Sequence, residues 1–169
     1  LARTSTCPSS RKGRFGYEMR LLLAIDDSEN AQRAVRYVGS LLKSTPDVFV
    51  TLFHVLKPMP RGLLEHGGSE NPVIEAQLRA RLREDREAWL RKEREAKCPT
   101  LLKACEMLAQ SGFDRGGVTL KFGHEDDVAA SILDEARSGQ YDTIVMGRRG
   151  ISRVTRMFGG GVTDRLLHD

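Results

Sequence analysis

Four short apolar runs, each followed by a stretch long enough for a helix, constrain the fold of this chain more than any other feature. The runs are LLLAI at 21–25, VFVTLFHV at 48–55, VTLKF at 118–122 and TIVM at 143–146. The first run is continuously apolar, as in a strand buried on both faces, and the second is β-branched and aromatic, which is typical of a strand. Helix-length connections between them favour parallel strands with right-handed crossovers. The sequence therefore predicts an α/β fold, an open parallel sheet with helices on both faces.

The first connection carries apolar residues at helical spacing. We expect its helix to begin after Asp27 or Ser28, because either side chain can accept hydrogen bonds from free helix N–H groups. The sequence STPD at 44–47 ends it.

The second connection is long and charged. Its helix is expected to begin near Asn71 with Pro72 in the first turn, to break at KCPT before Pro99, and to resume from 101 to 110. Acidic and basic residues alternate along it, which favours a solvated face over nucleic-acid binding. An apolar stripe runs along it through Ile74, Leu78, Leu82, Trp89 and Leu90. Trp89, at helical spacing with Leu78 and Leu82, is expected in the core or in a helix–helix contact.

Four polar residues near the strand ends have ordinary structural explanations. His54 falls in a buried strand, so we expect a satisfied core or pocket-edge histidine rather than a catalytic base. His124 is expected to be exposed in a turn. The pair Asp126 and Asp127 stands where the third helix begins, and capping explains it better than metal binding.

Composition limits the class of protein. A chain of 169 residues with 40% hydrophobic and 30% charged residues fits one soluble domain, and no apolar run approaches the roughly 20 residues of a membrane helix. Three cysteines without metal spacing favour a reducing, cytoplasmic setting. Residues 1–18 are rich in Arg and Ser, which predicts a disordered or non-native tail ahead of a domain spanning 19–169.

Two glycine clusters follow the fourth apolar run: GRRG at 147–150 and GGG at 159–161. In open parallel sheets, ligands bind at the carboxyl ends of strands where the strand order reverses. If the first and fourth strands are neighbours, the turns AIDDS at 24–28 and MGRRG at 146–150 share one crevice. Glycines leading into a helix N-terminus suit a phosphate, although a solvated glycine-rich loop is an alternative. The spacings of a P-loop and of the dinucleotide fingerprint are both absent.

These residues together resemble the universal stress protein family. Its glycine pattern, G-x2-G-x9-G-[ST], is similar to the spacing of Gly147, Gly150 and Gly160. The stretches LLLAIDDSEN, LFHV and GHEDD also resemble the family, from about Arg20 to the end of the chain. The resemblance implies a Rossmann-like, adenine nucleotide alpha hydrolase-like sheet. Its strand order would be 3-2-1-4 here, with the family's fifth strand missing from this chain.

The resemblance also implies an ATP site, accompanied by a divalent ion such as Mg²⁺. The residues implied at adenine and ribose are Ala24, Ile25, Asp26, Val55, Met146 and Gly147. Those implied at the phosphates, largely through backbone N–H groups, are Arg149, Gly150, Gly160, Gly161, Val162 and Thr163.

One departure from the family concerns the residue after the third glycine, which is Gly161 instead of Ser or Thr. Losing one hydroxyl donor to a charged group predicts ATP binding weakened by about ten- to a hundredfold. The family implies a regulatory ATP-binding protein of the stress response, acting as a homodimer or with a protein partner. We assign no catalytic residue and expect at most slow ATP hydrolysis. The alternative is a nucleotide-independent interaction module with the same fold.

Overall fold

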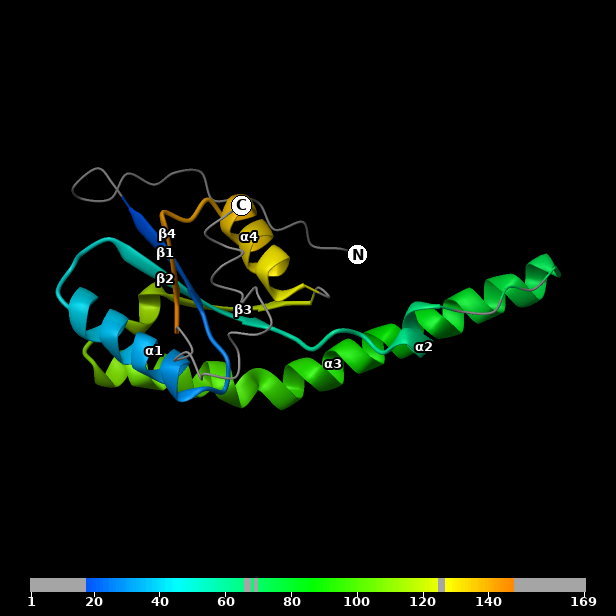
Figure 1. Ribbon diagram of the computed structural model, residues 1–169, viewed down its shortest axis with the longest axis horizontal. Helices are drawn as coiled ribbons and strands as arrows, with labels where there is room; N and C mark the ends of the chain where they lie inside the picture. The colour runs from blue at the N-terminus through cyan, green and yellow to red at the C-terminus, as the bar shows by residue number, and fades with distance from the viewer. Residues whose placement is uncertain (1–17, 66–67, 69, 125–126, 148–169) are drawn as a thin grey trace, which may run out of the picture.

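The computed structural model describes residues 18–65, 68, 70–124 and 127–147. Within them, four parallel strands form one sheet in the order β3-β2-β1-β4 (Figure 1). The strands are β1 (Met19–Ala24), β2 (Val48–Val55), β3 (Val118–Gly123) and β4 (Thr143–Met146). The predicted open parallel sheet and its order 3-2-1-4 are confirmed. A fifth strand would fall after 147, outside the described residues.

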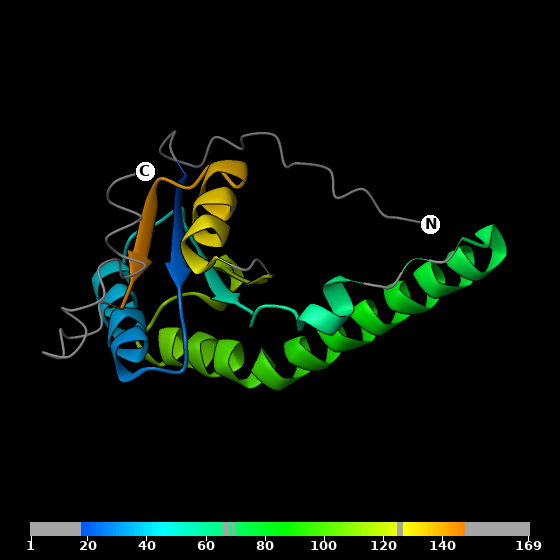
Figure 2. The same ribbon diagram turned by 45° about the vertical axis from the view of Figure 1, so that its right-hand side comes forward.

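Helices cover both faces of the sheet, as predicted (Figures 1 and 2). Helices α1 (Glu29–Leu42) and α3 (Pro72–Gln110) pack on one face, and α4 (Val128–Ser138) packs on the other. Two shorter pieces complete the described chain: α2 (Arg61–Leu64), which packs beside α3, and the 3-10 turn η1 (Arg115–Gly117) before β3.

The core divides into two clusters because successive strand residues point to opposite faces of the sheet. In β1, Leu21 and Leu23 join the cluster under α1 and α3, whereas Leu22 and Ala24 join the cluster under α4. Leu22 and Leu23 are both 0% exposed. This burial on both faces explains why β1 reads as a continuous apolar run.

Helix α1 begins at Ser28, one of the two caps expected there. The Ser28 hydroxyl oxygen accepts a hydrogen bond from the Ala31 N–H at 3.2 Å. Asp27 is not the cap; it faces α3 instead. At α4, Asp127 accepts from the Ala129 N–H at 2.9 Å, which confirms capping for that residue. Asp126 lies outside the described residues.

Helix α3 corrects the prediction of a break before Pro99. It runs without interruption through 39 residues, with Pro99 inside it. A proline removes one backbone hydrogen bond and crowds the preceding turn, but it does not force a helix to end. Here the residues after Pro99 are fixed to the sheet by buried side chains, beginning with Leu101 at 0% exposed, so tertiary packing keeps the helix continuous. The start is as expected, with Asn71 capping and Pro72 in the first turn.

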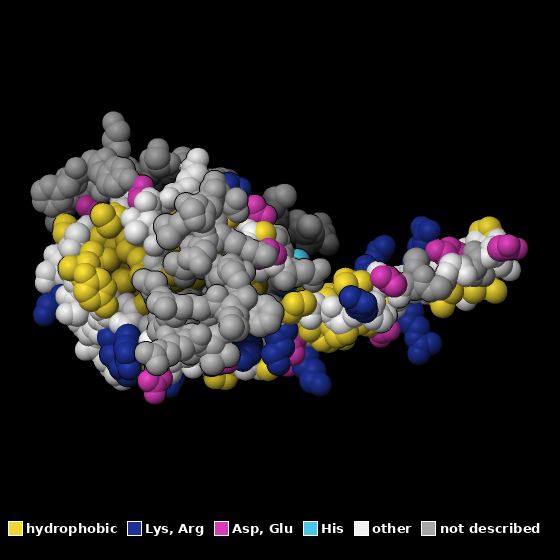
Figure 3. Space-filling view, in the orientation of Figure 1, with side chains coloured by type: hydrophobic (Ala, Val, Ile, Leu, Met, Phe, Trp, Pro, Cys, Tyr) yellow, Lys and Arg dark blue, Asp and Glu magenta, His cyan; other side chains and the backbone are white. Residues whose placement is uncertain are grey.

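The first two thirds of α3, residues 72–96, extend beyond the sheet and are called the arm below (Figures 1 and 2). Trp89 joins neither core cluster, so the core position, one of the two expected for it, is wrong. Ile74 and Leu78 are exposed, and the other three stripe residues are only partly buried. Helix α2 lies against the arm, where the Arg86 guanidinium donates hydrogen bonds to the carbonyls of Leu63 and Leu64. Figure 3 shows basic and acidic side chains interspersed along the arm.

In the described part of the chain, no helix combines the length and the apolar character that spanning a membrane requires.

Candidate functional site

The carboxyl ends of β1 and β4 lie side by side. Ala24 and Met146 are partners in the parallel register of these two strands. Both pack into the cluster under α4, and Val55 from the end of β2 packs into the same cluster. Three of the residues implied at the base therefore come together from three different strands, around the buried Ile132 of α4.

Ile25 is held at the end of β1 by two hydrogen bonds to β2. Its N–H donates to the Phe53 carbonyl at 2.9 Å, and its own carbonyl accepts from His54 Nδ1 at 2.8 Å. His54 is 6% exposed and meets the Phe122 ring edge-on, with 6.3 Å between ring centroids. It is a buried histidine with a satisfied ring nitrogen, which agrees with the core position given as one of the two expectations. The Ile25 side chain turns away from Ala24 and Val55 to the opposite face, under α1 and α3.

Asp26 begins the turn into α1. One carboxylate oxygen accepts a hydrogen bond from the Ser28 N–H at 3.0 Å, the geometry of an Asx turn. The side chain is partly exposed at the carboxyl edge of the sheet.

Gly147 is required by the close approach of two backbones. A Cβ at this position would lie 2.4 Å from the Asn30 carbonyl carbon and 2.4 Å from the Ala31 nitrogen. The chain leaving β4 thus passes directly over the first turn of α1. Gly147 is absent from the described residues with positive φ. Its freedom from a side chain, and not an unusual φ, is what the structure uses.

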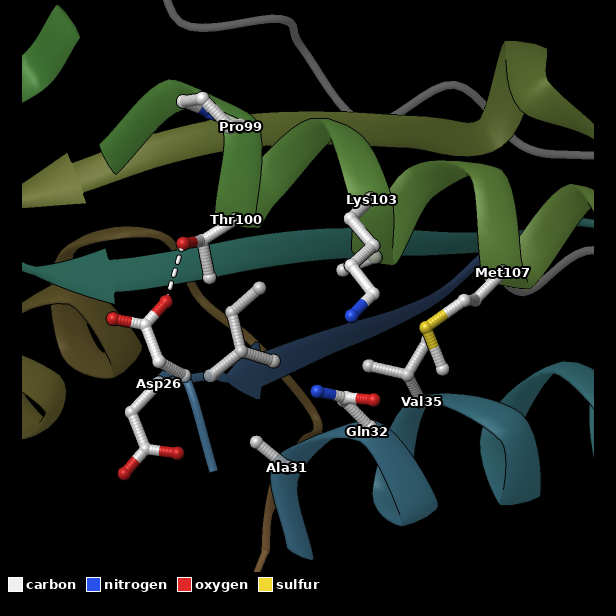
Figure 4. Close-up of a pocket in the computed structure, with 11 residues that line it drawn as sticks. Asp26, Ala31, Gln32, Val35, Pro99, Thr100, Lys103 and Met107 are labelled. Carbon is white, nitrogen blue, oxygen red and sulfur yellow. Dashed lines mark hydrogen bonds between the residues drawn. The ribbon is translucent and has the colours of Figure 1, made fainter. Parts of the chain in front are cut away.

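Asp27 forms a contact that the sequence analysis missed. Its two carboxylate oxygens accept hydrogen bonds from Lys97 Nζ and from the Thr100 hydroxyl, each at 2.5 Å. The dashed line in Figure 4 marks the bond from Thr100. The hydrogen bond from Lys97, followed by the one from Thr100, lowers the pKa of Asp27 below its ordinary value of 3.8. Both partners stand at least 70 residues away in the chain. No local pattern around Asp27 could have identified them.

A groove of about 300 Å³ lies between α1 and α3, beside this turn. Asp26, Asp27 and Thr100 stand at one end, and Lys103 and Gln32 reach toward each other across it (Figure 4). The remaining lining is mostly apolar and consists of Ile25, Ala31, Val35, Pro99, Ala104 and Met107. Helix α3 therefore lines a groove beside Asp26 and Asp27, on the face of the sheet opposite to Ala24, Val55 and Met146, which was not anticipated.

A comparison with protein families shows to which family this chain belongs. The model of the universal stress protein family matches residues 19–169. The chain belongs to the universal stress protein family. This confirms the resemblance inferred from the glycine spacing and the strand-end turns.

Solved universal stress proteins share the fold at low sequence identity. One from Archaeoglobus fulgidus is 18% identical, covers 89% of this chain and 86% of its own, and has a TM-score of 0.54. A universal stress protein in complex with cAMP is 13% identical. The match covers 89% of this chain and 90% of that protein, with a TM-score of 0.60. The A. fulgidus protein in complex with dAMP is 19% identical, with 90% of each chain covered and a TM-score of 0.50. No curated protein was found to be significantly similar to this universal stress protein.

The residues expected at the phosphates lie outside the described part of the structure. They are Arg149, Gly150, Gly160, Gly161, Val162 and Thr163. Their role stays a prediction from the family pattern. Among the described residues, no group of three or more His, Cys, Asp or Glu side chains is placed to hold a metal ion.

Proposed function

We propose that this universal stress protein binds an adenine nucleotide, with ATP as the expected ligand, at the carboxyl edge of β1 and β4. The observation that carries the proposal is the meeting of Ala24, Val55 and Met146 from three adjacent strands, beside the Asp26 turn. The cAMP and dAMP complexes of two solved relatives support an adenine nucleotide as the class of ligand.

Each part of the nucleotide has a chemically suitable partner in this arrangement. The apolar side chains of Ala24, Val55 and Met146 suit the base, and the Asp26 carboxylate suits the ribose hydroxyls, which are hydrogen-bond donors. The chain leaving β4 at Gly147 starts next to the N-terminus of α1. We expect the glycine-rich segment after it to hold the phosphates through backbone N–H groups, with Mg²⁺ accompanying a triphosphate.

The proposed role is regulatory. ATP binding would order the segment from 147 to 161 and thereby change a surface used by a second copy or another protein, in the cytoplasm. We assign no general base for hydrolysis among the described residues, and we expect His54, which is 6% exposed and hydrogen-bonds through Nδ1 to the Ile25 carbonyl, to hold the end of β1 in place. We therefore expect slow hydrolysis at most.

Calorimetric titration of Mg²⁺–ATP tests the proposal. The Asp26→Asn variant keeps an oxygen that can accept from the Ser28 N–H but loses the charge, so we expect affinity to fall by about ten- to a hundredfold. The matched control is Asp114→Asn. Asp114 makes the same kind of turn, because its carboxylate accepts a hydrogen bond from the Gly116 N–H at 3.1 Å. It precedes the amino end of β3, at the edge of the sheet opposite to the proposed site. The control should bind ATP like the native chain.

The Gly161→Ser variant separates the proposal from the nucleotide-independent alternative. Restoring the family's hydroxyl is expected to tighten ATP binding by about tenfold or more. If the native chain binds no ATP while the Gly161→Ser variant does, the alternative is correct. If neither binds, the adenine-nucleotide proposal is wrong.

A further inference from the structure

The turn from Ile25 to Ser28 is held by hydrogen bonds at every residue. Ile25 is tied to β2, Asp26 accepts from Ser28, and Ser28 caps α1. These contacts all lie within the continuous unit β1-α1-β2. Asp27 differs, because both of its hydrogen-bond partners come from α3.

The geometry of the Asp27 contact resembles a clamp. Lys97 and Thr100 are three residues apart, so they present their side chains from the same face of α3. Each occupies a different carboxylate oxygen of Asp27 at 2.5 Å. The Lys97 side chain is 23% exposed, which is low for a lysine, whereas the Asp27 side chain that it meets is 58% exposed.

We propose that Lys97 and Thr100 are positioning residues for the nucleotide site, acting through Asp27 on the adjacent Asp26. This inference rests on the proposed function. In the proposed site, Asp26 reaches the ribose only while the turn keeps its conformation. Among the described contacts, Asp27 is the residue of the turn whose side chain is held by α3, and the clamp fixes it there. A turn released from α3 must be reordered when nucleotide binds, and that cost appears as lost affinity.

If Lys97 and Thr100 served only the folding of the domain, a different result would be expected. If the clamp only docks α3 on the domain, its loss lowers stability and leaves the affinity of the folded protein unchanged. The matched control for this case is Lys121→Met. Lys121 forms a similar ion pair with Glu135 at 2.7 Å, but on the α4 face of the sheet.

The experiment is calorimetric titration of Mg²⁺–ATP into the native chain and into Lys97→Met, Thr100→Val, Thr100→Ser and Lys121→Met, each first checked for folding by circular dichroism. We expect Lys97→Met and Thr100→Val to weaken binding by about five- to tenfold, the scale set by ordering one residue's backbone. Thr100→Ser keeps the hydroxyl and should bind within about twofold of the native chain, as should Lys121→Met.

A double substitution supplies the second criterion. The loss caused by Asp27→Asn together with Lys97→Met should equal the larger single loss, because both changes release the same contact. Native affinity in both Lys97→Met and Thr100→Val overturns the inference and leaves the proposed function standing. Absence of ATP binding by the native chain overturns the proposed function, and the inference falls with it.

Discussion

The two parts of α3 share one helix but have different surroundings. After Pro99, the face that meets the sheet is buried, through Leu101, Ala104, Met107 and Leu108. Before Lys97, in the arm, no described residue is buried, although apolar side chains occur there too. Helical structure alone therefore does not show which part of α3 contributes to the free energy of unfolding. The contacts of each segment decide that.

The largest difference between the two parts should appear on truncating a leucine in each. Leu108 is 0% exposed and Leu78 is 39% exposed. We expect Leu108→Ala to lower the free energy of unfolding by about 3 kcal/mol, because it leaves a cavity in the core, and Leu78→Ala by less than about 0.5 kcal/mol. Urea unfolding followed by circular dichroism measures both values. Similar losses at the two sites would mean that the arm is packed in solution, for example against a second copy.

A smaller effect is expected at the junction between the two parts. Replacing Pro99 by Ala restores an N–H that can bond to the Glu95 carbonyl one turn earlier. Proline costs about 3 kcal/mol in a helix interior, but it also restricts the unfolded chain, so we expect Pro99→Ala to stabilise by roughly 1 kcal/mol. Chemical denaturation of this variant beside the native protein provides the measurement. A loss of stability would show that the proline is needed to direct the arm or to keep the Asp27 contacts.

The smallest effect concerns pH. The pKa of Asp27 is lowered in the folded state, first by the hydrogen bond from Lys97. The contact therefore contributes fully above the unfolded pKa near 3.8 and is lost as pH falls through the folded value. The Asp27 side chain is 58% exposed, so the contribution should stay below about 1 kcal/mol, as for other exposed ion pairs.

Thermal unfolding between pH 3 and pH 7 tests this assignment. The difference in Tm between the native protein and Lys97→Met should be largest near neutral pH and should shrink as the solution becomes acidic. A difference that grows toward acid would contradict it.

The sequence predicted those features of the fold that depend only on residues near one another in the chain. The bounds of β2 and β4 follow from apolar runs that begin and end as the strands do, and Asn71, Ser28 and Asp127 cap helices because a cap acts within one turn. The meeting of Ala24 with Met146 followed from the family's strand order.

Other features depend on parts of the chain far apart in sequence. The continuity of α3 through Pro99 rests on packing against the sheet, and the clamp on Asp27 joins residues 70 and 73 positions apart. Gly147 could be recognised as part of a glycine pattern, but its close approach to Asn30 and Ala31 could not. Local sequence carries no information about which distant backbone will lie against it.

The length of the arm has a mechanical consequence. At ~1.5 Å per residue, its tip near Pro72 lies roughly 40 Å along the helix from Lys97. Because α3 is one continuous helix, a tilt of about 5° at Lys97 would move the tip by roughly 3 Å, as a lever does about its fulcrum. A rotation of α3 at the Asp27 contact that is too small to alter the sheet would thus move the tip of the arm by about the diameter of a water molecule.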